Sequence, residues 1–153
     1  MKRIILLAFL CTTTLVMAQR INHVQEAIAN YDYEAALTLI AKEKPTIPLL
    51  LQKGKAQRGL GMNTEALSTY QEIIANDTAN TRAYIEAAEC CRSLAKYQQA
   101  LKYYEQALDL NPENKYVRIQ YIGLLLSLQK FQDALEESSL MTEKDSSAIA
   151  LHL

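Results

Sequence analysis

A repeat of fixed period constrains the fold of this chain more than any other feature of its sequence. Shifting the sequence by one period of about 34 residues, and then by a second, brings three segments into register at their apolar positions. A fixed period of this kind indicates one supersecondary unit that is repeated, with neighbouring units burying a shared core. The matching columns are Leu60, Leu94 and Leu128; Asn63, Tyr97 and Phe131; Ala66, Ala100 and Ala134; and Leu67, Leu101 and Leu135.

Each copy of the repeat contains two apolar faces with helical spacing. Within a copy the apolar residues recur every three or four positions, which is typical of one side of an α-helix. A short polar break such as Ala95–Lys96 separates the two faces, so the sequence predicts pairs of antiparallel helices. Each pair leaves an apolar face uncovered, and we therefore expect an all-α fold, an α-solenoid of stacked pairs. The two faces of one copy are Tyr84, Ala87, Ala88 and Cys91, then Leu101, Tyr104, Ala107 and Leu108.

The repeat resembles the tetratricopeptide family, whose pattern is W-x2-L-G-x2-Y, then A-x3-F, then A and P. The copy Thr81–Asn114 fits best, with Tyr84 at the Trp place, Ala100 and Tyr104 in the second helix, and Pro112 at the end. The copy Ile47–Asn80 keeps Leu50, Gly54, Ala66 and Tyr70, and the copy Lys115–Ala148 keeps Leu125, Phe131 and Ala134.

The copies also depart from the family pattern. Arg118 stands where an aromatic residue is usual. An earlier, degenerate copy is visible as Tyr33-x-x-Ala36-Leu37 after a helix from about residue 21 to 31, and its second helix is expected to be short or its turn altered. Residues 146–153 read as the start of a fifth copy, so the tetratricopeptide domain is predicted over residues 19–153, with about four helix pairs and the start of a fifth.

Two polar pairs are expected to open new helices. Asn111–Pro112 combines a good N-cap residue with a proline that suits the first helical position. Asp77–Thr78 is expected to do the same one copy earlier.

Residues 1–18 are predicted to be a cleaved signal peptide and to lie outside the fold. Lys2 and Arg3 are followed by an apolar run, and Val16-Met17-Ala18 suits cleavage after Ala18. The apolar stretch is shorter than the ~20 residues of a spanning helix, so we expect no membrane span after cleavage. The protein is then periplasmic or secreted, an exported bacterial-type member of the family. Without Lys2 and Arg3 the chain has 14 basic and 17 acidic residues, which gives no reason to expect nucleic-acid binding.

The sequence shows no set of residues for catalysis, a cofactor or a metal. His23 and His152 lie at opposite ends of the chain, and no phosphate loop or hydrolase motif is present. Cys90 and Cys91 are adjacent, without metal-ligand spacing, and are interpreted as a surface thiol and a core residue respectively. Tyr70, Tyr84, Tyr97 and Tyr104 fall at core places of the repeat rather than on a stacking platform.

The resemblance implies a concave surface lined by the first helix of each pair, at fixed places of the repeat. The Lys and Asn of a carboxylate clamp are not matched, since Ile85 with Glu89 and Ile119 with Gly123 stand at their places. The surface grades from basic to apolar, which suits an amphipathic helix or an extended peptide with an acidic end; the alternative is an ordinary solvated face. The residues carried over are Lys55 and Arg58; Arg82, Ile85, Glu89 and Arg92; and Tyr116, Ile119 and Leu126.

These observations favour a scaffold or adaptor that binds another protein in the cell envelope, and not an enzyme. The alternative is an N-terminal fragment or structural domain of a longer exported repeat protein.

Overall fold

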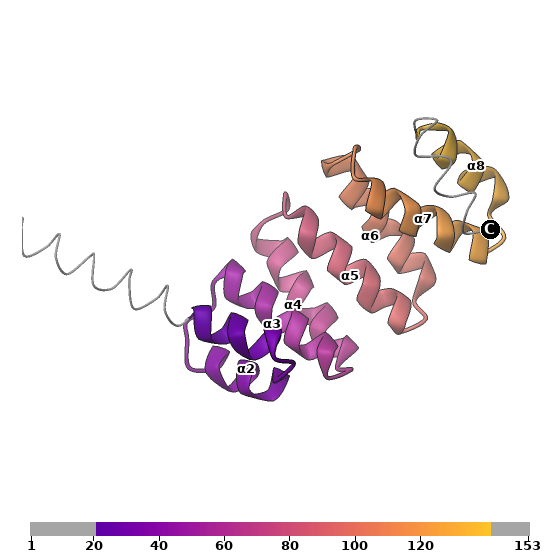
Figure 1. The fold of residues 1–153 in the computed structure, drawn as a ribbon. Helices are drawn as coiled ribbons and strands as arrows, with labels where there is room; N and C mark the ends of the chain where they lie inside the picture. The colour runs from indigo at the N-terminus through magenta and orange to yellow at the C-terminus, as the bar shows by residue number, and fades with distance from the viewer. Residues whose placement is uncertain (1–20, 142–153) are drawn as a thin grey trace, which may run out of the picture. The chain divides into compact units, whose positions relative to one another are not determined.

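The computed structural model describes residues 21–141, and every regular element in that range is a helix (Figure 1). The prediction of an all-α helical-repeat fold is thereby confirmed. Residues 21–29 are helical. The helices that follow are α2 (Tyr33–Ile40), α3 (Ile47–Gly59), α4 (Asn63–Asn76), α5 (Thr81–Ser93), α6 (Tyr97–Leu110), α7 (Lys115–Ser127) and α8 (Phe131–Ser139).

The chain divides into two compact units, Met1–Thr69 and Tyr70–Leu153, and the division falls inside α4. The predicted signal peptide, residues 1–18, and the predicted start of a fifth copy, residues 146–153, lie outside the described residues.

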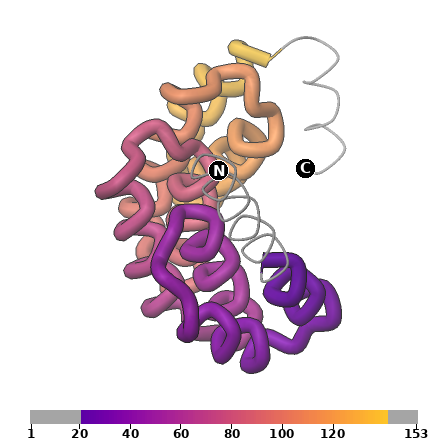
Figure 2. The backbone as a smooth tube through the Cα atoms, turned by 90° about the vertical axis from the view of Figure 1, so that its left-hand side faces the viewer, coloured from indigo at the N-terminus to yellow at the C-terminus, as the bar shows by residue number. Residues whose placement is uncertain are grey.

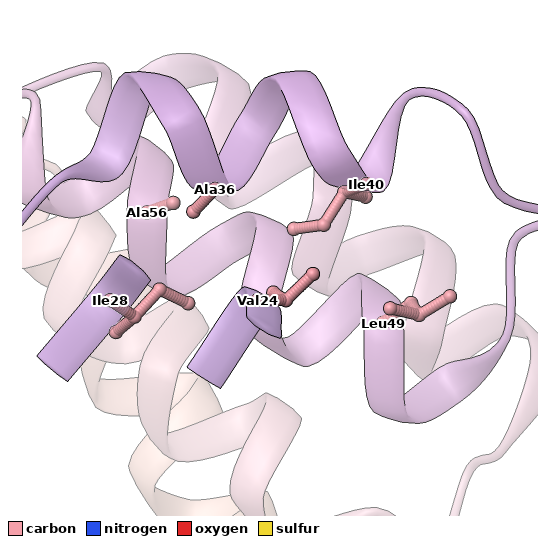
Figure 3. Close-up of a cluster of buried hydrophobic side chains, with 6 residues drawn as sticks. All are labelled: Val24, Ile28, Ala36, Ile40, Leu49 and Ala56. Atoms are coloured by element: carbon pink, nitrogen blue, oxygen red, sulfur yellow. The ribbon is translucent and has the colours of Figure 1, made fainter. Parts of the chain in front are cut away.

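The first unit has a core built from the helical residues 21–29, α2 and α3. Figure 3 shows the apolar side chains of these elements pointing toward one another. Helix α2 has 8 residues against 14 in α4, so the prediction of a short second helix in the degenerate copy is confirmed. A Cβ atom at Gly59 would lie inside contact distance of the Tyr33 ring, so only glycine fits beside that ring without a shift. The core residues are Val24, Ile28, Ala36, Ile40, Leu49 and Ala56.

The second unit contains α5 to α8, and consecutive helices pack against each other. Short turns join α5 to α6 and α7 to α8, and Figure 2 shows the backbone reversing direction between successive helices. Ala88 and Ala100 are both fully buried, as expected where two helices approach closely. The two helical faces predicted from the sequence are also the buried faces of α5 and α6: Tyr84, Ala87, Ala88 and Cys91, and Leu101, Tyr104, Ala107 and Leu108.

The helices open at different residues from those predicted as caps. Asn80 and Asn114 cap α5 and α7, and their side chains accept hydrogen bonds from the backbone N–H groups of Ala83 and Val117. The prediction that Asn111–Pro112 opens a helix is wrong, because the Asn111 N–H still donates to Ala107 and closes α6.

The same correction applies to Asp77–Thr78. The Asp77 carboxylate accepts from the Ala79 N–H and from the side chain of Asn80, so it shapes the turn before the cap. An Asn or Asp side chain that stabilises a turn has the same sequence signature as one that caps a helix.

The interpretations of Cys90 and Tyr97 also need correction. The sequence predicts a surface thiol at Cys90, but Cys90 and Cys91 are both buried, with 0% exposure. Cys90 occupies the same place of the repeat as Leu124, which is also buried. Burial raises the pKa of the Cys91 thiol, which disfavours a reactive thiolate. Tyr97, predicted in the core, is 43% exposed.

The turn between the two helices of a copy requires one residue in the left-handed region. Gly61, Ala95 and Gln129 have φ angles of 75°, 56° and 59°, and they stand at the same place in successive copies of the repeat. Tyr31, with φ of 61°, has the same conformation in the degenerate copy. Only glycine adopts this conformation without a steric cost.

We therefore predict that Ala95→Gly stabilises the fold by about 0.5–1 kcal/mol. Relief of the left-handed strain exceeds the entropy that glycine adds to the unfolded chain. Urea unfolding followed by circular dichroism measures the change. Gly61→Ala is the matched control and should shift stability in the opposite direction. A lower stability of Ala95→Gly than of the parent protein would show that the turn carries no strain large enough to offset the entropy that glycine adds to the unfolded chain.

Candidate partner-binding surface

The residues predicted to line a binding groove fall on the sides of helices that point away from the core. None of them is buried. Lys55 is exposed and Arg58 is half-buried on α3, in the first unit. All the others lie in the second unit, on what we call the outer face of α5 and α7: Arg82, Ile85, Glu89 and Arg92 of α5, and Tyr116, Ile119, Gly123 and Leu126 of α7.

On α5 the outer face is charged, and its charges are largely engaged within the protein. The Arg92 guanidinium donates from Nη1 to Oε1 of Gln120 at 2.8 Å. The same nitrogen lies 3.3 Å from the Tyr104 hydroxyl and 3.5 Å from Oε1 of Glu89. Tyr104 in turn donates to Glu89 at 2.5 Å, so one network joins α5, α6 and α7.

This network changes the interpretation of Arg92. The sequence suggests that Arg82 and Arg92 together grip an acidic ligand, but the structure gives Arg92 three partners inside the unit. Burial is the main cause that raises the pKa of Tyr104, and its bond to Glu89 acts in the same direction, so the phenol stays protonated. Arg82 is exposed and lies at the first turn of α5. It is therefore the cation of α5 best placed to meet a ligand.

On α7 the outer face is apolar. Tyr116 is 56% exposed, and Ile119 and Leu126 are half-buried. The opposite side of the same helix is also apolar, since Val117 and Leu125 are buried in the core. A helix with apolar side chains on two sides is normally covered on both of them.

Gly123 lies in the middle of this apolar outer face. A Cβ atom built on Gly123 would have no heavy atom within 4 Å, so no neighbour in the structure requires a glycine. A glycine in a helix interior costs about 1 kcal/mol relative to alanine. Glycine also lets another backbone approach a helix closely. The surface at Gly123 is therefore open, and the backbone of a partner could approach α7 closely there.

Two small pockets lie elsewhere. One of about 340 Å³ in the first unit is lined by His23, Val24, Leu39, Lys42 and Glu43. One of about 300 Å³ in the second unit lies among α6, α7 and α8, and its lining includes Glu105, Leu108, Arg118, Tyr121 and Leu140.

Within residues 21–141 no three His, Cys, Asp or Glu side chains gather as metal ligands. Among the described helices, none has the length and apolar character needed to cross a bilayer. His152 lies outside the described residues.

Comparison with known proteins adds family and structural relatives. Two family profiles, both described as tetratricopeptide repeat, match residues 51–115 and residues 93–152. No curated protein matches the chain.

Three solved structures illustrate the likeness in fold. A tetratricopeptide repeat protein from Parabacteroides merdae ATCC 43184 is 22% identical with a TM-score of 0.75, over 86% of this chain and 57% of that chain. MamA from Desulfovibrio magneticus RS-1 is 17% identical with a TM-score of 0.72, over 78% of this chain and 70% of that chain. The first TPR of Spaghetti (RPAP3), bound to an HSP90 peptide, is 21% identical with a TM-score of 0.69, over 73% of this chain and 92% of that chain.

Proposed function

This chain belongs to the tetratricopeptide-repeat family, and on that premise we propose that it is a scaffold that binds another protein, and not an enzyme. The partner presents a helix or peptide to the outer face of α5 and α7. The observation that carries the proposal is the apolar outer face of α7, where Tyr116 is 56% exposed and the helix is apolar toward its core as well. The similar RPAP3 structure, which holds an HSP90 peptide, supports a peptide-binding role.

The charges of the outer face suggest which kind of segment binds. Arg82 offers an exposed cation at one end, while Tyr116, Ile119 and Leu126 offer apolar contacts. An amphipathic segment with an acidic residue beyond its apolar side chains would match both. The spacing of Tyr116, Ile119 and Leu126 along α7 is the spacing of one helix face, so a helix can lie along it.

Substitutions at Gly123 distinguish effects on the stability of the fold from effects on the binding of a partner. We predict that Gly123→Ala raises the free energy of unfolding by about 1 kcal/mol, because alanine favours the helix and meets no neighbour. Gly123→Gln should make the fold about as stable as Gly123→Ala does, because glutamine is also a good helix former. Its longer side chain should, however, block the close approach of a partner. Thermal unfolding measures the change in stability of both variants.

The binding effect is read by affinity capture with mass spectrometry, comparing the amount of each protein recovered by the parent and by Gly123→Gln. Lys102→Gln on the exposed side of α6 is the control. We expect a specific protein to be lost with Gly123→Gln and retained with Lys102→Gln. Recovery of the same proteins in the same amounts by all variants would contradict it.

We also propose that the scaffold works in the cell envelope, after export and removal of residues 1–18. The support is the sequence alone, namely Lys2 and Arg3 before an apolar run and small residues before Gln19. N-terminal sequencing of the mature protein should find Gln19 as the first residue. A mature protein that begins at Met1 would refute export by this route.

The alternative proposal is that the chain forms part of a longer exported repeat protein. Its support is that similar structures such as the Parabacteroides protein are longer than this chain. Sequencing the transcript past the codon for Leu153 separates the two.

A further inference from the structure

A hydrogen-bond network crosses the outer face where Arg92 of α5 reaches Gln120 of α7. Nη1 of Arg92 donates to Oε1 of Gln120 at 2.8 Å and lies 3.5 Å from Oε1 of Glu89. The pKa of Arg92 is raised, mainly by its hydrogen bond to Tyr104, and Tyr116 acts electrostatically in the same direction. Tyr116 therefore lies close to the guanidinium, and the network borders the apolar part of the outer face.

The network still has hydrogen-bonding groups to offer. Arg92 carries only donors, so the carbonyl oxygen of Gln120 must face it and the NH2 group of Gln120 must face away. Within residues 21–141 neither this NH2 group nor Nη2 of Arg92 donates a hydrogen bond. Glu89 uses Oε1 for its contacts, and its Oε2 accepts from no other group in the described part of the chain. The side chains of Glu89, Arg92 and Gln120 are all half-buried.

These groups decide which side chain of a partner fits against them. A partner that covers the network removes water from it, and each polar group left unpaired then weakens binding. The charges of Arg92 and Glu89 cancel, so a partner carboxylate would be repelled by Glu89 and a partner ammonium by Arg92. A leucine would leave every polar group unpaired. A carboxamide both accepts and donates, so it alone among these side chains matches the donors and the acceptor together.

We propose that the outer face selects a partner segment with one neutral amide side chain, Asn or Gln, set within an apolar stripe. The amide oxygen accepts from Gln120 or Arg92, the amide NH2 group donates to Oε2 of Glu89, and the flanking apolar side chains contact Tyr116. This preference rests on the proposed binding of a protein segment by the same face, and it names the polar residue that the segment carries. The acidic residue suggested for Arg82 lies elsewhere in the segment, because Arg82 precedes Arg92 by about 15 Å along α5.

A phage-displayed library of random 16-residue peptides is the probe. It is selected in parallel on the full chain and on Gln120→Glu, and only clones whose binding Tyr116→Ala weakens are kept, because these bind the outer face. Gln120→Glu keeps the size of the side chain and its contact with Arg92, but replaces the NH2 donors by an acceptor and makes the network negative. We expect Asn or Gln within the apolar stripe of the peptides selected on the parent chain, and Lys or Arg there in those selected on Gln120→Glu.

Synthetic peptides measure the size of the preference. Fluorescence anisotropy compares the most enriched parent-selected peptide with versions that carry Asp or Leu in place of its amide residue. We expect each version to bind the parent chain about tenfold more weakly, because each leaves polar groups unpaired. Gln106→Glu on α6, an exposed residue given the same change of charge, is the matched control and should leave the three affinities unchanged. Both Gln→Glu variants should keep the helicity of the parent protein by circular dichroism.

Two results would overturn the amide preference and leave the proposed function intact. One is a set of peptides that bind the outer face without Asn or Gln in the apolar stripe. The other is recovery of the same peptides on the parent chain and on Gln120→Glu. If Tyr116→Ala weakens none of the selected peptides, the outer face binds no segment, and the proposed function fails together with the preference.

Discussion

Tyr104→Ala is expected to lower the free energy of unfolding by about 3–5 kcal/mol, the range for removing a large buried ring. Tyr104 is fully buried on α6, and its hydroxyl lies between Glu89 and Arg92. The substitution leaves a cavity under α5 and also removes a hydrogen-bond partner from two charged groups. Urea unfolding at neutral pH measures the loss.

Tyr104→Phe separates the two contributions. The ring still fills its site, so only the hydroxyl bonds to Glu89 and Arg92 are lost, at a cost of about 1–2 kcal/mol. If Tyr104→Ala and Tyr104→Phe lose the same amount, ring packing contributes nothing and the register of the repeat is wrong. If Tyr104→Phe costs nothing, the network does not join the helices.

Arg118→Ala is expected to cost about 2–3 kcal/mol, close to the lower end for a buried ion pair that loses one partner. Arg118 forms an ion pair with Glu137 of α8, and the two side chains are 11% and 26% exposed. Its Nη2 also donates to the carbonyl oxygen of Pro112 at 2.7 Å. Removing the guanidinium leaves the Glu137 carboxylate partly buried and unpaired.

The family pattern suggests a rescue of Arg118→Ala. Arg118 stands at the place of Tyr84, where an aromatic residue is usual. The double substitution Arg118→Tyr with Glu137→Leu should therefore return to within about 1 kcal/mol of the parent protein, because a well-packed apolar pair can replace a buried ion pair. A double variant as unstable as Arg118→Ala would mean that the charges themselves hold α8 in place.

The sequence predicts the buried side of each helix well because the period of the repeat and the period of the helix act together. Spacing alone places Tyr84, Ala88, Leu101 and Tyr104 in the core, and all four are buried. Spacing identifies the side that faces the partner helix of the same copy. It is less informative about the sides that lie under the neighbouring copies.

Spacing misplaces Cys90 and Tyr97 for that reason. Cys90 lies off the face formed by Tyr84, Ala88 and Cys91, yet it has 0% exposure. Comparison with Leu124 at the same place would correct it, since a leucine there already indicates burial. Tyr97 shares a column with Asn63 and Phe131, and a column that admits asparagine is not a strict core place.

The candidate surface was only partly accessible from sequence. Helical spacing places Tyr116, Ile119 and Leu126 on one face, and the structure keeps them off the core. Spacing could not predict that Arg92 bonds to Gln120, because that contact joins residues far apart in the sequence through the packing of α5 against its neighbours. The open space beside Gly123 likewise depends on the packed structure.

Site-specific photocrosslinking tests most directly whether the outer face of α7 holds a partner protein. Tyr116 is replaced by p-benzoyl-phenylalanine, which keeps an aromatic ring at a position that is 56% exposed. Lys102 on α6, also exposed, receives the same residue as the control. We expect a discrete crosslinked product of this chain with another protein from position 116, and none from position 102. Equal products from both positions, or no product from position 116 in cells that make the protein, would contradict it.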